Sequence, residues 1–482
     1  MKWLPTAMLL VLAAPAVAQA PLAPRNNSPA TSPVAPKPAT AMATKSAKMS
    51  AAARTAVGAP GYRTFTMYNG MKVTLIHAGV DKKAVVDLEL NTGQIDEPAF
   101  APGLAALTAG LLLEGTIART SAQILSEAAS FGGAINTSVG PVSTSLSGEV
   151  GTEHIARFIS LLSDVVRHPR LDTAGFERVR RNTQRALDST LQNAGHRARQ
   201  QWRAMVFPDH PFGRPYSYTA TLAALQLGHA RNDYDDNFGA ARAHIYVSGV
   251  FDDNLIEHAV RDAFSDWKAG SAAAPRPTAA VARRQFMLVD SPGAAKSTIW
   301  LGLPVIDPSS SDFVKLEVAN GLLSGAFGSS ATMNFGDDQG LTGSTGSNIW
   351  MRKGASYWAG VAQVNGDSTG FALESMLNQI EHLRREVPAD SEVERVKQDV
   401  IGRFNALRLS RQGIVSQLAY VDEFGLGEIW LAEYVKRVMA VSAEDIRQMA
   451  ASQLDPERMT ITVVGDRATV EPQVGRFRPQ AP

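Results

Sequence analysis

The chain has 482 residues, of which 45% are hydrophobic and 19% are charged, and this composition excludes a wholly disordered or collagen-like protein. Its 47 basic and 46 acidic side chains leave a formal charge of +1, so charge gives no argument for a nucleic-acid partner. The chain contains no cysteine, which excludes disulfides, thiolate metal sites and cysteine nucleophiles.

Residues 1–20 have the pattern of a secretory signal peptide. Lys2 supplies a positive charge, residues 7–14 form a short apolar run, and small-x-small cleavage patterns end at Ala18 and Ala20. The run is shorter than the roughly 20 apolar residues that span a bilayer. We therefore expect an exported protein without a membrane span, and export without cysteine favours the bacterial periplasm. A buried N-terminal helix is the alternative interpretation.

Residues 21–60 contain Pro, Ala, Ser and Thr with almost no large apolar side chain. Such a stretch buries too little surface to offset the entropy that is lost on ordering, so we expect a disordered tether. The folded part begins with residues 65–76, which predict a β-hairpin with a two-residue turn of the primed type at Asn69 and Gly70.

The rest of the chain repeats one order of elements. Alternating strands are predicted at residues 86–90 and 299–303. An amphipathic helix then follows in each half, with its apolar positions at Ile155, Phe158, Ile159 and Leu162, and at Leu373, Met376, Leu377 and Ile380. Second helices open near Glu177 and Glu394, and apolar strands that end in glycine close the two halves at Gly249 and Gly465.

The spacing between these landmarks indicates a duplication. The offsets are 217 residues from Glu177 to Glu394, 216 from Gly249 to Gly465, and 218 from Gly103 to Gly321. We predict two duplicated domains, residues 61–270 and 283–475, with a linker at 271–282 and a tail at 476–482. Strands lead, helices follow and a strand returns, which is typical of the α+β fold class.

Five segments make the chain resemble a known family. Residues 103–116 (Gly-Leu-Ala-Ala-Leu-Thr-Ala-Gly-Leu-Leu-Leu-Glu-Gly-Thr) are similar to the signature helix of the pitrilysin and insulinase type of zinc peptidases, in the branch like the mitochondrial processing peptidase. Residues 131–136 and 207–215 resemble the family's Gly-Gly-x-x-Asn and Phe-Pro-x-His-Pro-Tyr-Gly-Arg-Pro segments, and residues 301–308 and 357–383 resemble its second domain. The resemblance implies that each domain is a mostly antiparallel sheet covered by helices.

The catalytic motif of that family is missing. Its helix carries His-x-x-Glu-His, in which two histidines hold zinc and the glutamate polarises the attacking water. The three positions fall on Ala106, Ala109 and Gly110, and a later carboxylate ligand of the family falls near Arg185 or Ala186. The resemblance therefore implies no catalytic residue in this chain. The residues also fit a plain buried helix, and both interpretations can hold together.

The nine histidines offer no replacement for the motif. No two of them stand three to five positions apart, so no helix carries the paired imidazoles of common zinc motifs. We predict no metal and no other cofactor in this chain, with zinc only in a partner subunit. We interpret His210, which lies in a proline-rich loop, as structural.

A glycine-rich segment in the second half is a candidate for substrate contact. Residues 321–346 contain seven glycines, which permit close approach of another backbone, and the resemblance implies that a loop here handles substrate. The family's Arg/Tyr pair for substrate is absent or displaced to Arg352 and Tyr357. The alternative is a surface loop that contacts nothing. The predicted substrate-binding residues are Asn136, Thr137, Phe327, Ser329, Ser330, Leu341 and Thr342.

Two functions remain from the sequence. The first is a non-catalytic subunit of a periplasmic zinc-metallopeptidase heterodimer, in which a homologous partner with His-x-x-Glu-His cuts peptides and this chain forms half of the chamber. Extended peptides would add to sheet edges at residues 136–139 and 341–342. The second is a self-associating scaffold without a proteolytic role. Neither function involves a nucleic acid or a membrane span.

Overall fold

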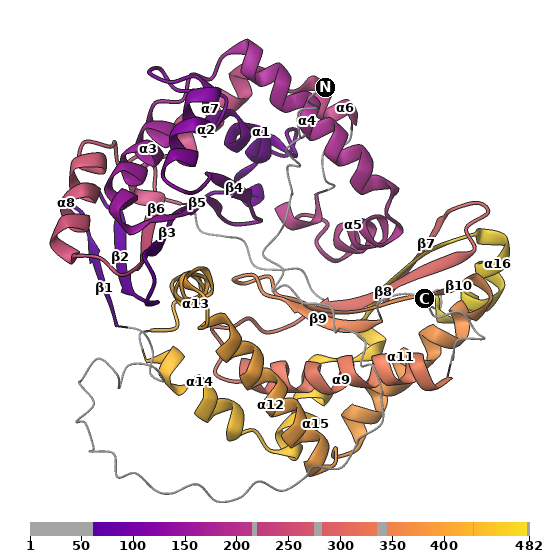
Figure 1. The fold of residues 1–482 in the computed structure, drawn as a ribbon. Coiled ribbons are helices and arrows are strands. Elements are labelled where there is room, and N and C mark those ends of the chain that lie inside the picture. The colour runs from indigo at the N-terminus through magenta and orange to yellow at the C-terminus, as the bar shows by residue number, and fades with distance from the viewer. Residues whose placement is uncertain (1–60, 215–218, 274–281, 335–344, 428, 480–482) are drawn as a thin grey trace, which may run out of the picture.

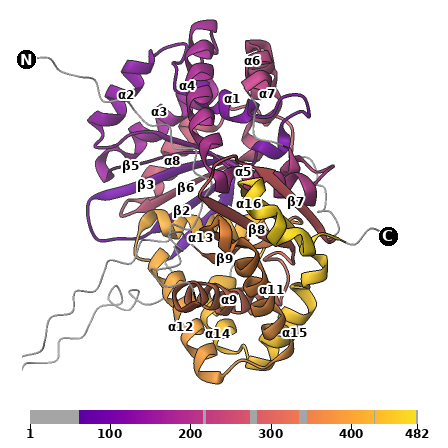
Figure 2. The same cartoon turned by 90° about the vertical axis from the view of Figure 1, so that its right-hand side faces the viewer.

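The computed structural model describes residues 61–214, 219–273, 282–334, 345–427 and 429–479. Two sheets, each with its own helices, form two halves of the molecule (Figure 1), and a perpendicular view also separates the halves (Figure 2). Within the described ranges, no helix is long and apolar enough to cross a membrane. The predicted signal peptide and tether lie outside the described residues.

The first sheet has six strands in the order β1-β2-β6-β3-β5-β4. All neighbours are antiparallel except β2 and β6, which are parallel. The strands are β1 (Tyr62–Thr66), β2 (Lys72–His77), β3 (Lys83–Leu90), β4 (Asn136–Val139), β5 (Thr144–Gly151) and β6 (Ala243–Gly249).

The second sheet has five strands in the order β7-β11-β8-β10-β9, again with one parallel pair, β7 and β11. Its strands are β7 (Gln285–Asp290), β8 (Lys296–Pro304), β9 (Gly346–Trp350), β10 (Tyr357–Asn365) and β11 (Thr460–Gly465). The two orders match strand for strand once β1 is set aside, so β2 corresponds to β7 and β6 to β11. Two mostly antiparallel sheets with matching topology confirm the predicted α+β duplication.

Helices of the first half cover one face and one end of the first sheet. They are α1 (Leu104–Leu112), α2 (Ser121–Ser130), α3 (Ile155–Arg167), α4 (Thr173–Gln192), α5 (Ala194–Val206), α6 (Thr219–Ala224), α7 (Leu227–Asn237) and α8 (Asp253–Phe264). The predicted apolar stripe of α3 is fully buried against the sheet, and α8 packs beside it. Helices α1, α4, α6 and α7 share a smaller apolar core.

Helices of the second half repeat this arrangement on the second sheet. They are α9 (Phe313–Asn334), α11 (Thr369–Arg385), α12 (Asp390–Leu407), α13 (Arg411–Phe424), α14 (Trp430–Met439), α15 (Ala443–Gln453) and α16 (Arg467–Val474). Leu373, Met376 and Ile380 of α11 are buried in the core of this half, as their helical spacing predicts.

One helix of each half crosses to the sheet of the other half. Helix α5 packs on β8 and β11, where the buried indole of Trp202 donates its N–H to the carbonyl of Thr460 at 2.9 Å. Helix α13 packs on β3 and β6, where Gln412 donates to Asp87 at 3.0 Å. Figure 1 shows α13 below the first sheet and α5 above the second. Each half therefore completes the other.

The first hairpin differs from the prediction in its turn. Met67 donates its N–H to the carbonyl of Met71 at 2.8 Å, which leaves a three-residue loop at 68–70. Gly70 has a φ of 91°, whereas Asn69 does not enter the left-handed region. A primed two-residue turn of the Asn-Gly kind needs a positive φ at both positions, but a three-residue loop needs it only at the last. The predicted two-residue turn was therefore wrong.

One of the three duplication landmarks was also misassigned. Gly103 precedes α1 with a φ of 91°, whereas Gly321 lies inside α9. The counterpart of Gly321 is Gly110 of α1, because a methyl group added at either glycine would meet a valine of a later long helix. This helix is α4 in the first half and α12 in the second. These valines are Val179 at 2.7 Å and Val396 at 2.4 Å. The sequence could not distinguish a capping glycine from a packing glycine.

Candidate functional site

Helix α1, which carries the positions of the missing catalytic motif, is anchored at its first turn. The carboxyl of Glu97 accepts the N–H of Ala105 at 3.0 Å, and the guanidinium of Arg214 donates to the carbonyl of Glu97. Glu97 is only 7% exposed, and burial raises its pKa to about 8 despite the bonds from the Gly103 and Ala105 backbone. The helix is therefore held by a buried group that keeps its proton at neutral pH.

The three motif positions present only small side chains and backbone. Ala109 is 1% exposed, and Ala106 and Gly110 are half-buried. Val179 of α4 occupies the space above Gly110, since a Cβ at position 110 would lie 2.7 Å from its Cγ1 atom. An imidazole at this position would need Val179 to move. The contact between α1 and α4 is thus apolar packing where the family has metal ligands.

Helix α4 supplies no carboxylate at the position of the family's third zinc ligand. Arg185 is exposed and donates to the side chain of Asn182 on its own helix at 2.6 Å. Ala186 is half-buried, and its carbonyl accepts the hydroxyl of Thr190 at 2.9 Å. Neither residue offers a lone pair to a cation from its side chain.

These positions do not fit a zinc ion. Zinc in proteins takes imidazole, thiolate or carboxylate ligands, and the side chains at the motif are two methyl groups and a hydrogen atom. In the part of the chain that the structure describes, no three His, Asp or Glu side chains gather as a metal site elsewhere. His210 is 6% exposed, accepts the N–H of Phe212 at 3.1 Å and packs on its ring, so it has a structural role.

Strand β4, one end of the first sheet, lies directly beside α1. It pairs with β5 on one side and with no other described strand. Asn136 is exposed at its start, and Thr137 is half-buried with a hydroxyl that has no partner among the described residues. An open edge presents backbone N–H and C=O groups to which an extended peptide can add. The structure therefore brings Asn136 and Thr137 together with the motif helix.

The other predicted substrate residues lie in the second half. Phe327 is 2% exposed and fills the core between α9 and the second sheet. Ser329 and Ser330 lie in the last turns of α9. Leu341 and Thr342 lie outside the described residues. Residues 321–334 of the predicted glycine-rich loop are therefore helical, because α9 continues through them, and Leu323 and Phe327 are buried in the core of the second half.

Arg352 and Tyr357, the predicted positions of a displaced Arg/Tyr pair, both contact other groups of the protein. Tyr357 is 5% exposed, and its ring stacks on Trp350 with 5.1 Å between centroids and an angle of 9°. Arg352 donates to the carbonyl of Met351 at 2.5 Å. Tyr357 is part of an aromatic layer between α5 and the second sheet.

A polar layer that the sequence patterns did not predict lies where α13 crosses to the first sheet. Asp422 of α13 binds Lys72 at 2.6 Å and His244 at 3.4 Å, and these partners lower its pKa to about 2, His244 more than Lys72. Asp87 accepts Gln412, and burial raises the pKa of Asp87. The alternation of β3 carries a signal for such a polar face, but nothing in the sequence indicates that α13 covers it.

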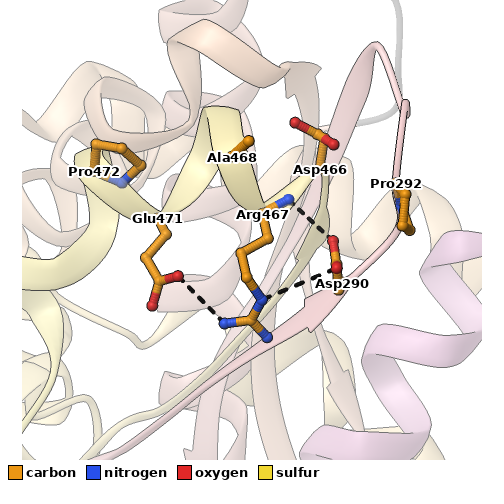
Figure 3. Close-up of a pocket in the computed structure, with 7 residues that line it drawn as sticks. All are labelled: Asp290, Pro292, Asp466, Arg467, Ala468, Glu471 and Pro472. Atoms are coloured by element: carbon orange, nitrogen blue, oxygen red, sulfur yellow. Dashed lines mark hydrogen bonds and ion pairs between the residues drawn. The ribbon is translucent and has the colours of Figure 1, made fainter.

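A hollow of about 600 Å³ lies beside β7 and the start of α16 (Figure 3). Arg467 forms an ion pair with Glu471 at 3.3 Å and donates its backbone N–H to Asp290 at 3.0 Å. The lining contains no histidine and no hydroxyl group, and its carboxylates bond to protein groups: Asp290 and Glu471 to Arg467, and Asp466 to the N–H of Thr469. It is lined by Asp290, Pro292, Asp466, Arg467, Ala468, Glu471 and Pro472.

Two profiles of one peptidase family match successive parts of the chain. The family profile "Insulinase (Peptidase family M16)" matches residues 72–220, and the profile "Peptidase M16 inactive domain" matches residues 225–400. The chain is also similar to the coenzyme PQQ synthesis protein F of Pseudomonas syringae pv. tomato, with 26% identity over 193 residues. That match spans 39% of this chain and only 25% of the relative's length.

Two solved structures share the fold. One is a peptidase M16 inactive domain from Pseudomonas fluorescens, with a TM-score of 0.76 and 18% identity over 84% of this chain and 98% of the other. The second is a protease from Helicobacter pylori, with a TM-score of 0.77 and 16% identity over 84% of this chain and 99% of the other. At such low identity these likenesses support the two-domain arrangement alone.

Proposed function

The chain belongs to the insulinase family of peptidases, family M16, and from this premise we propose that it is a non-catalytic subunit of a periplasmic zinc-metallopeptidase heterodimer. A homologous partner with an intact His-x-x-Glu-His motif supplies the zinc and cuts peptides. This chain forms the opposing wall of the chamber, and in this role it holds no cofactor of its own.

The observation that carries this proposal is the filled contact between α1 and α4. Three of the four positions that ligate zinc or activate water in the family are Ala106, Ala109 and Gly110, and Val179 packs where a second imidazole would project. A lost ligand alone would leave a cavity, which costs stability. Here the neighbouring helix fills the space, so the surface suits packing and not metal binding.

Peptide contact in this proposal is made by strand addition. The β4 edge beside α1 offers backbone groups to an extended segment, and Asn136 and Thr137 lie on that edge. Side chains that alternate along a strand would give little sequence selectivity where the neighbours are Asn, Thr and Ser. This chain therefore contributes affinity for extended peptides, while the partner contributes the chemistry.

The alternative function is a self-associating scaffold without a proteolytic role. An aromatic layer supports it, because large rings fill the space between α5 and one face of the second sheet and leave that face closed. The rings are those of Trp202, Phe207, Phe212, Trp300, Trp350 and Tyr357.

Zinc content and peptide hydrolysis test the proposal. The purified mature chain should contain zinc at well below one equivalent by elemental analysis and should not cut a fluorogenic peptide library. Added to the His-x-x-Glu-His homologue of the same host, it should raise hydrolysis until the two chains are equimolar. Near-stoichiometric zinc in the isolated chain would contradict the lost-site interpretation, and a flat titration would favour the scaffold.

A further inference from the structure

Strand β7 is an edge of the second sheet with an apolar sequence and an open side. It pairs in parallel with β11 and with no other described strand. Its residues 285–289 are half-buried, and their sequence Gln-Phe-Met-Leu-Val contains no lysine and no proline. Proteins usually protect such edges with charges, proline, bulges or a covering strand, because an open edge pairs with other chains.

In the first half, an additional strand covers the edge that is open in the second half. Strand β2 corresponds to β7, and β1 covers its outer side in antiparallel pairing over residues 62–66. In the second half the corresponding position beside β7 holds no described strand. The second sheet therefore has five strands where the first has six.

Hydrogen bonds identify the backbone groups that face outward. The N–H groups of Gln285 and Ser291 bond to the carbonyls of Met459 and Gly465, next to and in β11, at 3.5 and 2.9 Å. Because successive residues of a strand direct these groups to opposite sides, residues 286, 288 and 290 direct theirs away from the sheet. Within the described ranges, the outward N–H groups of Phe286 and Leu288 have no partner.

Among the described residues, the side chain of Arg467 reaches this outer side. The guanidinium of Arg467 donates to the carbonyl of Leu288 at 3.4 Å, a long bond, and the same side chain pairs with Glu471 and lies 4.0 Å from Asp290 (Figure 3). A carbonyl oxygen has two lone pairs, so this contact leaves one of them for a further donor.

We propose that β7 pairs in antiparallel register with β7 of a second copy of this chain. The two five-stranded sheets then form one continuous ten-stranded sheet across a twofold axis, with the same surface used by both copies. This dimer goes beyond the proposed function, since it uses neither α1 nor β4.

Two features select the register: the charges of the facing residues, and the outward backbone groups of every second residue. In an antiparallel pair, opposite side chains share a face, so a symmetric pairing of these strands centres on one residue that faces itself. With Met287 at the centre, Phe286 lies opposite Leu288 and Arg284 lies opposite Asp290, twice by symmetry. With Leu288 at the centre, apolar Phe286 would face charged Asp290.

A centre at Phe286 is also less favourable, because Leu288 would then face Arg284. In the Met287 register both end pairs are complementary. Arg284 donates to the carbonyls of Pro456 and Phe477 and has no ion-pair partner in the part of the chain that the structure describes. The side chain of Asp290 is 43% exposed. Opposite charges on facing residues of a sheet stabilise the pairing.

A single cysteine tests this register directly, because the natural chain has none. Met287 faces its own copy as a non-hydrogen-bonded pair, for which the Cα atoms lie about 4.5 Å apart, within the range of a disulfide. Under mild oxidation, the Met287→Cys protein should become mostly a disulfide-linked dimer. Gln285→Cys is the matched control, since its copies would lie about 13 Å apart along the strands. No cross-link at Met287, or equal cross-linking of both variants, overturns the proposal.

Sedimentation velocity of the chain without added cysteines gives an independent test. Wild type should dimerise, and Asp290→Arg should weaken the dimer about tenfold, because each Arg284 would face a like charge. Leu288→Pro removes one outward N–H without touching the bonds to β11 and should abolish the dimer, with circular dichroism as the check on folding. Asp399→Arg, an exposed change on α12, should have no effect. A monomer at all concentrations, or dimers that both β7 variants leave unchanged, overturns the proposal.

Discussion

At the scale of single residues, the contact between Gly110 and Val179 fills the space on α1 that a zinc ligand would need. Two helices approach closely at a glycine, and the branched side chain of the neighbouring helix fills the space above it. The sequence alone established the absence of the ligands. It could not establish what had replaced them, because Val179 is 69 positions away and is apolar like many helix residues.

Gly110→Ala should destabilise the protein although alanine favours a helix. The new methyl group would lie 2.7 Å from Val179, and overpacking of this kind costs about 1–3 kcal/mol, more than the roughly 1 kcal/mol of helix propensity gained. Urea denaturation should therefore show a lower free energy of unfolding, and adding Val179→Ala should recover part of the loss.

Gly402→Ala is the matched control for this substitution. Gly402 lies within α12, is exposed, and has no atom within 4 Å of an added Cβ. The same change there should raise the free energy of unfolding by up to about 1 kcal/mol. Equal stabilisation at both glycines would mean that Val179 does not fill the space above Gly110.

The buried carboxyl of Glu97 makes stability depend on pH. Its pKa is raised from 4.5 to about 8, so between these values the folded chain holds a proton that the unfolded chain has lost. The free energy of unfolding then falls as pH rises, by at most about 1.4 kcal/mol per pH unit for one group. Glu97→Gln should remove this contribution, measured as a flatter stability profile from pH 5 to 8.

Other buried acids with raised pKa values also make the free energy of unfolding fall as pH rises, so a second variant is needed for comparison. Burial raises the pKa of Glu89 to about 7, and Glu89→Gln should flatten the profile only up to that pH. Each profile should therefore flatten in the range up to the pKa of the substituted group, and this range extends to higher pH for Glu97 than for Glu89. Identical profiles for wild type and Glu97→Gln would mean that Glu97 ionises normally in the folded protein.

At the scale of elements, local patterns correctly predicted α3, α11, β3 and β8. The stripes of α3 and α11 and the alternation of β3 and β8 mark faces that are buried in the structure. The patterns failed where glycine has more than one use, since residues 321–334 continue α9 although their composition indicates a loop. They also could not predict that α5 and α13 leave their own halves, because an apolar stripe does not specify which sheet it covers.

This exchange of helices predicts that neither half folds alone. A fragment of residues 61–270 would expose the buried rings of Trp202 and Phe207 on and after α5 and would leave the polar face with Asp87 without α13. It should aggregate, as measured by size-exclusion chromatography, or bind a hydrophobic dye. Co-expression with residues 271–482 should restore a folded complex.

Cleavage of the assembled protein provides the control for this prediction. A protease site inserted at residues 271–282, the predicted linker, should allow cutting without dissociation, because α5 and α13 hold the halves together. A soluble, cooperatively unfolding 61–270 fragment would show instead that the crossed helices are dispensable.

At the scale of the whole molecule, the duplication is accurate in topology and uneven in chemistry. The first half presents a polar sheet face beneath α13 and an edge at β4, whereas the second half buries an aromatic layer beneath α5. The offsets of about 217 residues predicted the repeated fold. The family resemblance located the motif positions, whereas the proposed partner subunit could not be read from the sequence of one chain.

The crossed helices also have a consequence for biosynthesis. The indole of Trp202 bonds to Thr460 in β11, the last strand of the chain, across 258 positions. The ribosome must therefore complete almost the entire polypeptide before the first half can acquire its native contacts. Contacts this distant in sequence slow folding, so the nascent protein should remain dependent on chaperones until its final strand emerges.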